Sequence, residues 1–427
     1  MGRQIHLTKG IKLVDVWLPY GRTEVCARIP TESLKGIIEA DEAAGVENPL
    51  DEIKESLKNP VSAESLAEIV KPGSRVALAL NIFDPVIDKL IVSSVLEELA
   101  QSGLKADDLT VFLSHEIFNS GGGNLANQLI DELSPLGVNV VLHDISGENV
   151  YVGETSAGIK VYLNRFFAES EVKIAAGTVK PDPYILYEWS GCSVIPGLSN
   201  LETAKQIFIH ALNLDFPSDL IYESIAEASQ KAGIDFSINI LVNRNGEIVK
   251  SVAGDMDKAF SEASKIADKI YRVPIESGAD IVFISSGGAP FDASFSKACR
   301  CLENALKTVR RRGVIVLVAE CPEGYGDLDF YESLSRFRND LNSLGKSLRR
   351  RFTFGGFVAY RFLRALRKAN IAVVSAMPEY YFSEISSLKI FRTANEALNY
   401  ALEERGKKAK ISVFPHGNFV IPEIKKS

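Results

Sequence analysis

The feature that most constrains this fold is a series of short apolar runs separated by stretches with helical periodicity. The first four apolar runs span residues 75–82, 109–114, 138–144 and 172–176. Helical patterns fill the gaps between them, for example at 87–102 and 125–133. Apolar strands that alternate with helices are typical of parallel βαβ units whose sheet is covered on both faces. The sequence therefore predicts an α/β fold with mainly parallel sheets flanked by helices.

A second series of the same kind follows an interruption. Residues 238–254 form two alternating runs around Asn245 and Gly246, which predicts a β-hairpin. The strand–helix rhythm then resumes with apolar runs at 280–288, 313–321, 371–377 and 410–417. A chain of 427 residues is also too long for one ordinary core.

We therefore expect two α/β domains, residues 1–272 and 273–427, with the boundary near 273–279. The last helix or strand is a candidate to pack back on the first domain. A cleft between two such domains is a preferred ligand site.

The N-terminal part differs from both series. Residues 11–30 alternate around a Tyr-Gly-Arg turn and predict a β-hairpin. His6 is expected in an unstructured start, and residues 41–68 read as polar and mostly helical.

Charge and composition exclude several classes of protein. The net charge of −7 argues against a nucleic-acid partner. The sequence has no run of 18 apolar residues and no apolar signal core at its start, so we expect a cytoplasmic protein without a membrane span. Five dispersed cysteines fit reduced thiols better than a disulfide framework.

One local charge feature departs from this acidic average. Residues 341–370 contain eight Lys and Arg residues and no Asp or Glu. A solvated helix face is the first interpretation of such a segment. The alternatives are a surface for an anionic substrate, for an anionic polymer or for an acidic partner subunit.

Loops at the carboxyl ends of parallel strands are where α/β proteins bind ligands. His115 follows the run at 109–114 and precedes three glycines at 121–123. An imidazole there could ligate a metal or transfer a proton, and an equal alternative is a hydrogen bond to a loop carbonyl.

Asp182 and Cys192 lie ten residues apart in the Pro- and Gly-rich stretch 177–197. Cys192 would bind a metal or act as a nucleophile only as a thiolate. A small buried hydrophobic residue is the favoured alternative for this cysteine.

Two cations follow a later strand. Lys297 and Arg300 are three residues apart on a predicted helix, so they share one face and could grip a carboxylate. A solvated basic edge is the alternative. His416, between Pro415 and Gly417 in the last strand-end loop, is interpreted as a turn residue.

Five short motifs, in order, resemble the nickel-dependent lactate racemase family over nearly the whole chain. They are Leu-Pro-Tyr-Gly at 18–21, Ser-His-Glu at 114–116, the stretch 177–197 that ends in Pro-Gly, Gly-Gly-Ala-Pro-Phe-Asp at 287–292, and the Ala-Glu-Cys loop at 319–326.

The resemblance implies a two-domain α/β enzyme that racemises or epimerises 2-hydroxy acids. In the family, a nickel pincer nucleotide tethered to a lysine exchanges a hydride with the substrate carbon, and histidines bind the metal or transfer protons. The resemblance implies catalytic roles for His115, Asp182 and Cys192, substrate binding by Tyr20, Lys297 and Arg300, and cofactor binding by Gly177, Gly191, Gly287 and Gly288.

The sequence departs from the family pattern where the cofactor is held. In a gap-free superposition on 177–197, the family's histidine falls on Asp182 and its tethering lysine on Cys192. Its nickel-ligating histidine falls on Phe208, and His210 lies two residues later. The loop at 81–85 lacks the family's acid and arginine. A cysteine cannot form the lysine's amide.

Two main hypotheses follow from these departures. The first is an altered racemase or epimerase in which Cys192 and Asp182, with His115 and with His210 as a further candidate ligand, hold nickel or zinc, or the pincer nucleotide binds without its tether. The second is an inactive homologue, without a cofactor, that binds a small anionic metabolite or a protein partner. A purely structural subunit that uses residues 341–370 as an interface ranks last, and assembly into an oligomer stays open.

Overall fold

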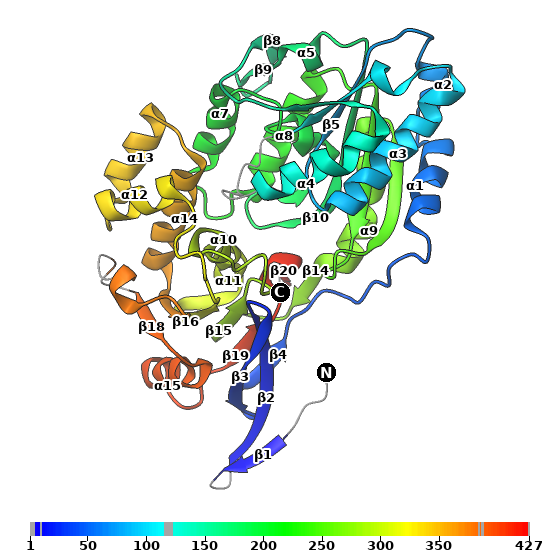
Figure 1. Cartoon of the computed structure of the whole chain (residues 1–427). Helices are drawn as coiled ribbons and strands as arrows, with labels where there is room; N and C mark the ends of the chain where they lie inside the picture. Colours follow the sequence, from blue (N-terminus) through cyan, green and yellow to red (C-terminus); the bar gives the residue numbers. More distant parts are fainter. Residues whose placement is uncertain (1–4, 9–10, 115–122, 383–384, 386–387, 426–427) are drawn as a thin grey trace.

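The computed structural model describes residues 5–8, 11–114, 123–382, 385 and 388–425. Figure 1 shows two main sheets in separate parts of the molecule, each packed against its own helices. The α/β architecture that the sequence predicts is therefore confirmed.

The first sheet carries the first series of apolar runs. Its strand order is β13-β12-β10-β5-β6-β7, and every neighbouring pair is parallel except β12 and β13. The strands are β5 (Val76–Leu80), β6 (Leu109–Leu113), β7 (Asn139–Leu142), β10 (Val172–Asp182), β12 (Phe236–Val242) and β13 (Ile248–Gly254). The antiparallel pair β12–β13 confirms the hairpin predicted around Asn245 and Gly246.

The second sheet is parallel throughout. Its order is β18-β17-β16-β15-β19-β4. The strands are β4 (Leu34–Ile37), β15 (Ala279–Ser285), β16 (Val309–Val318), β17 (Asn370–Val374), β18 (Lys389–Phe391) and β19 (Ile411–Phe414). Four of these six strands overlap the second series of apolar runs.

Helices occupy most of the connections between strands. In the first half they are α1 (Pro49–Lys58), α2 (Leu66–Ile69), α3 (Pro85–Gln101), α4 (Gly123–Leu133), α5 (Arg165–Ala168), α6 (Ser190–Val194), α7 (Leu201–Ala211), α8 (Ser218–Lys231) and α9 (Met256–Tyr271). In the second half they are α10 (Phe295–Ala298), α11 (Leu302–Thr308), α12 (Leu328–Phe337), α13 (Leu341–Arg350), α14 (Phe354–Lys368) and α15 (Ala394–Arg405). Short 3₁₀ turns are η1 (Ala106–Asp108), η2 (Ser134–Leu136), η3 (Cys299–Cys301), η4 (Glu379–Phe382) and η5 (Gly417–Phe419). None of the helices in the described ranges combines the length and the apolar character needed to cross a membrane.

Local interactions explain where the predicted element bounds were wrong. Helix α3 begins two residues before the predicted start because Asp84 accepts hydrogen bonds from the backbone N–H groups of Val86 and Ile87. Strand β10 runs six residues past the predicted end because residues 177–179 continue its pairing with β12 and residues 180–182 pair antiparallel with β11 (Leu186–Glu188). The predicted helical stretch 41–68 contains only α1 and α2, and His6 lies in strand β1 (Ile5–Thr8) rather than in an unstructured start.

The N-terminal hairpin packs on the second sheet, although the sequence analysis assigned it to the first domain. Strands β2 (Ile11–Tyr20) and β3 (Thr23–Pro30) form the predicted hairpin. Val14 and Val16 on its inner face share an apolar cluster with Phe283 of β15, whereas Trp17, the next residue along the strand, is 43% exposed. The next strand, β4, pairs with β19 at the edge of the second sheet. Residues 11–37 therefore lie with the second half: β2 and β3 belong to a separate three-stranded sheet packed on the second sheet, and β4 is an edge strand of it. A division of the remaining chain near residue 273 stays a prediction.

Two further contacts connect the halves. Strand β20 (Ile421–Ile424) pairs with β14 (Arg272–Ile275), so the C-terminal strand returns to the segment that joins the two series. The largest buried apolar cluster includes side chains of both halves, among them Phe208 and Phe357. Strands β8 (Asn149–Glu154) and β9 (Lys160–Asn164) form a separate hairpin on the first half.

Candidate functional site

The stretch 177–197 lies at the carboxyl end of β10, where the two halves meet. After β10 the chain turns into β11, and helix α6 begins at Ser190. Asp182 fixes this turn because its Oδ1 accepts hydrogen bonds from Tyr184 N at 2.8 Å and Ile185 N at 3.1 Å. The Asp182 side chain is thus held by its own turn and is almost fully buried.

Asp182 also forms an ion pair across the two halves. Its Oδ2 accepts a hydrogen bond from Nη2 of Arg300, and the exposed fractions of the two side chains are 4% and 14%. The Arg300 guanidinium lies over the ring of Tyr184 at 5.3 Å from its centroid. Burial opposes the charge of Arg300, but the carboxylate of Asp182 raises its pKa. Asp182, predicted to be catalytic, and Arg300, predicted to bind substrate, are therefore paired with each other.

Lys297 differs from Arg300 although both follow the same strand. It lies on α10 and is half-buried. Within the described residues, its ammonium group has no ion-pair or hydrogen-bond partner. Of the two predicted carboxylate-binding cations, Lys297 is thus the one available to an anionic ligand.

Cys192 is enclosed in the apolar core of the first half. Its side chain is 3% exposed, and its Sγ lies 4.0 Å from the carbonyl oxygen of Tyr187. Burial raises the pKa of this thiol far above its ordinary value. A protonated thiol is a poor nucleophile and a poor metal ligand. Cys192 therefore has the surroundings of a small buried hydrophobic residue.

The two predicted cofactor-binding glycines in this stretch are covered by the chain itself. A Cβ on Gly191 would lie 2.4 Å from the indole ring of Trp189, and one on Gly177 would lie 3.1 Å from the Trp189 carbonyl oxygen. Trp189 is 1% exposed and stacks on Phe260 with a centroid distance of 4.4 Å. The indole ring of Trp189 occupies the space next to Gly191, so a side chain has no room at this position. The chain itself therefore fills the space in which these two glycines would contact a cofactor.

Gly191→Ala is therefore expected to destabilise the protein by about 1–3 kcal/mol, because the new methyl group overpacks the core against Trp189. The measurement is the free energy of unfolding in urea. Gly36→Ala is the matched control, since nothing lies within 4 Å of a Cβ at that position, and it should change stability by less than about 0.5 kcal/mol. Equal effects of the two substitutions would contradict the packing described for Trp189.

The other two predicted glycines, Gly287 and Gly288, lie in a loop where three of the sequence motifs come together. A Cβ on Gly288 would lie 2.7 Å from the carbonyl oxygen of Gly21, so the loop at 287–292 approaches the turn at 18–21 closely. The buried Asp292 accepts hydrogen bonds from Gly21 N at 2.7 Å and Glu320 N at 3.0 Å. The motifs at 18–21, 287–292 and 319–326 thus meet around one carboxylate.

Asp292 is a residue that the sequence analysis did not single out. In the sequence, Asp292 is only the last residue of the motif at 287–292. The feature that could have pointed to it is that three motifs follow strands and could therefore meet. Tyr20, predicted to bind substrate, lies in the same place. Burial and the nearby carboxyl of Glu320 raise its pKa to about 12, so its phenol stays protonated at neutral pH.

The described members of the predicted metal site do not come together. No three His, Cys, Asp or Glu side chains in the described part of the chain come together as metal ligands. The grouping of Asp182, Cys192 and His210 is therefore wrong: Cys192 is enclosed, Asp182 is paired with Arg300, and His210 is exposed on α7. His115, the first predicted catalytic residue, lies outside the described residues, and its role stays a prediction.

Phe208, which stands where the family has a metal-binding histidine, is part of an aromatic cluster between the halves. It is fully buried and packs on Phe352 at 6.1 Å and on Phe357 at 5.2 Å between ring centroids. Together with the enclosed thiol of Cys192 and the filled space at Gly191, this cluster does not fit a nickel nucleotide tethered through a lysine amide.

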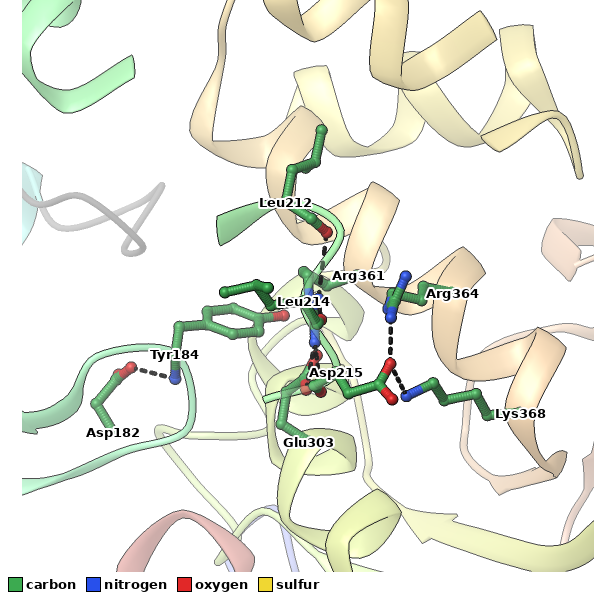
Figure 2. A network of polar contacts seen from close by, with 9 residues as sticks. All are labelled: Asp182, Tyr184, Leu212, Leu214, Asp215, Glu303, Arg361, Arg364 and Lys368. Carbon is green, nitrogen blue, oxygen red and sulfur yellow. Dashed lines mark hydrogen bonds and ion pairs between the residues drawn. The ribbon is translucent and has the colours of Figure 1, made fainter. Parts of the chain in front are cut away.

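The basic segment 341–370 is not only a solvated helix face. Figure 2 shows Arg361 of α14 between the halves, where its guanidinium binds both carboxylate oxygens of Glu303 at 2.7 Å. It also donates to the carbonyl oxygens of Leu212 and Leu214 at 3.3 and 2.6 Å. Its side chain is 1% exposed. The first interpretation of this segment is therefore wrong for Arg361, which connects the two halves.

The remaining cations of α14 in this network are partly exposed. Arg364 and Lys368 both pair with the carboxylate of Asp215, just beyond α7 (Figure 2).

In the loop after β19, burial and then Arg244 lower the pKa of His416 to about 4, so its imidazole is neutral at pH 7.

Comparisons with known proteins agree with the order of motifs. A model of the lactate racemase N-terminal domain matches residues 20–215, and a model of the lactate racemase C-terminal domain matches residues 275–422. Lactate racemase of Lactiplantibacillus plantarum is 22% identical over 433 residues, which cover 96% of this chain and 100% of that protein. Lactate racemase of Thermoanaerobacterium thermosaccharolyticum is 22% identical over 432 residues, with 96% and 99% covered.

Solved structures show the same fold. The lactate racemase apoprotein from T. thermosaccharolyticum superposes with a TM-score of 0.84 at 19% identity, over 96% of this chain and 100% of that one. A protein of Thermotoga maritima superposes with a TM-score of 0.60 at 12% identity, over 90% of this chain and 100% of that one. The resemblance noted in the sequence is confirmed: the chain belongs to the lactate racemase family.

Proposed function

We propose that this protein acts on a small 2-hydroxy acid as a racemase- or epimerase-type enzyme with an altered cofactor site. The observation that carries the proposal is Lys297, a half-buried residue on the helix that follows β15, whose ammonium group has no partner within the described residues. A lysine of this kind is a point charge suited to a carboxylate. The family membership supplies the substrate class.

The other candidate residues suggest how the ligand would be held. The substrate carboxylate would bind Lys297, while the Asp182–Arg300 ion pair keeps the two halves in contact. Tyr20 would supply a protonated phenol as a hydrogen-bond donor. We propose that any nickel, zinc or pincer nucleotide is held here without a lysine amide, because position 192 carries a cysteine.

A second candidate function is an inactive homologue that binds the same class of anion. The observation in its favour is that Arg300 is already neutralised by a carboxylate of its own chain. In that case Lys297 alone would bind a metabolite, and binding would raise the stability of the protein without turnover.

Lactate is the first probe for both candidates. We expect natively purified protein to bind D- or L-lactate in calorimetry. Lys297→Gln should weaken that affinity about tenfold or more, since hydrogen bonds to charged groups contribute about 1.5–3 kcal/mol. Lys346→Gln, at an exposed lysine of α13, is the control.

The same preparations separate the two candidates. Interconversion of the lactate enantiomers, with nickel or zinc content measured in parallel, would support the altered enzyme. Binding that depends on Lys297 without interconversion would support the inactive homologue. An equal affinity in the Lys297→Gln and unmodified proteins would overturn both.

A further inference from the structure

A pocket on the second half is walled by four tyrosine rings. It has a volume of about 380 Å³ and is lined mainly by Tyr325, Tyr331, Leu334, Tyr380, Tyr381 and Ile385. The rings form one contiguous aromatic surface, because Tyr325 lies 5.1 Å from Tyr331 and 5.9 Å from Tyr381, and Tyr380 stacks on Tyr381 at 4.4 Å. This surface lies between the start of α12 and η4.

Part of this wall is fixed and part of it reaches solvent. The hydroxyl of Tyr325 donates to the carbonyl oxygen of Tyr381, and the loop that carries Tyr325 accepts hydrogen bonds from the backbone of Phe295 and Ser296 at 2.8 and 3.2 Å. Tyr331 and Tyr380 are 44% and 67% exposed. The pocket is therefore open to a ligand, and these two rings are exposed enough to be replaced without disturbing the core.

The chain segments that carry the tyrosines are acidic. Residues 323–332 contain four carboxylates and no Lys or Arg, and Glu379 precedes Tyr380. No ion pair with a described residue neutralises any of these five carboxylates. Burial, and then the neighbours Asp327 and Glu332, raise the pKa of Asp329, and Arg351 offsets only part of this effect. These carboxylates do not line the pocket, but they give the segments that carry its tyrosines a net negative charge, beside the single Arg336 near the end of α12.

Aromatic rings and uncompensated carboxylates favour the same kind of ligand. The face of a tyrosine ring carries partial negative charge and attracts a cation within about 6 Å. Among the described residues, the pocket's lining includes no basic side chain, and apart from the phenols its only polar side chain is Ser335. A charged group without N–H donors would therefore leave no hydrogen bond unmade there.

We propose that this pocket binds a small organic cation of the quaternary alkylammonium class. The positive head would lie against the rings of Tyr331 and Tyr380, and the carboxylates of α12 would add long-range attraction. The described residues that line this pocket are different from those proposed to hold the hydroxy acid, and the proposal does not depend on that function.

Choline is the probe, and its neutral isostere 3,3-dimethylbutan-1-ol is the control ligand, both titrated into the full chain by calorimetry. We expect choline to bind about tenfold more tightly than the alcohol, because only a cation gains from the ring faces. Equal affinities would overturn the proposal, since they would leave only shape and apolar contact.

Substitutions of the tyrosines test whether choline binds in this pocket. Tyr331→Leu should weaken choline binding several-fold, whereas Tyr331→Phe, which keeps the ring, should not. Tyr380→Leu is a second test at a more exposed ring, should the first variant fail to fold. Tyr151→Leu, at a tyrosine of β8 that is 54% exposed, is the matched control. Choline binding that survives both leucine substitutions, or that the control abolishes, would overturn the proposal.

Discussion

Replacing Arg361 by methionine is expected to lower the free energy of unfolding by about 3–5 kcal/mol, one of the two largest effects that the structure predicts. The guanidinium binds both oxygens of Glu303 and the carbonyl oxygens of Leu212 and Leu214. Methionine fills much of the volume but leaves a carboxylate that is 4% exposed without its counter-ion. An unpaired buried charge costs far more than the pair itself contributes. Urea unfolding followed by circular dichroism measures the change.

Two further variants identify the cause of that loss. Arg361→Met combined with Glu303→Leu should recover most of the stability, because both charges are then absent. Arg364→Gln removes a neighbouring arginine of α14 whose partner Asp215 keeps Lys368, and should cost about 1 kcal/mol or less. If Arg361→Met cost no more than Arg364→Gln, the buried network between the halves would not be present in solution.

Introducing lysine at position 192 is expected to destabilise the protein by about 3 kcal/mol or more. Cys192 is 3% exposed beside Trp189, so a longer side chain overpacks the site and brings an ammonium group into apolar surroundings. Burial lowers the pKa of a lysine, so the loss should be smaller at about pH 10, near the ordinary pKa of lysine, than at neutral pH. Thermal unfolding at the two pH values measures both effects.

Two control variants separate the effect of the added charge on stability from the effect of losing the thiol. His210→Lys places a lysine on the exposed face of α7 and should change stability by less than about 0.5 kcal/mol. Cys192→Ala removes only the thiol and should cost about 1 kcal/mol. A Cys192→Lys protein as stable as the unmodified chain would mean that the site opens to solvent and could accommodate the family's tethering residue after all.

Local patterns in the sequence predicted most of the secondary structure. Apolar runs between helical stretches predicted four strands of each sheet, because strands buried on both faces need apolar side chains throughout. The Asn245-Gly246 turn predicted the β12–β13 hairpin for an equally local reason. The bounds were less accurate, as at β10, where pairing with β11 extends the strand to Asp182.

The candidate site was predictable in its location more than in its chemistry. Motif order led to the strand-end loops, to the stretch 177–197 and to Lys297. Nothing local distinguishes a buried thiol such as Cys192 from a reactive one, because its pKa depends on which side chains enclose it. The metal grouping of Cys192 with Asp182 and His210 was wrong for a related reason: the partner of Asp182 and the exposure of His210 are also set by the tertiary structure.

What the sequence by itself determined is thus the α/β class, the family and the strand ends at which a site would lie. Only the tertiary structure decided that Asp182 pairs with Arg300 across 118 residues of chain and that Arg361 is buried against Glu303. It also decided that the hairpin β2–β3 packs on the second sheet and that β4 joins its edge. The physical reason is range: strand and helix formation follow from the order of neighbouring residues, whereas the charge state, burial and partner of a side chain depend on segments that only the folded chain brings together.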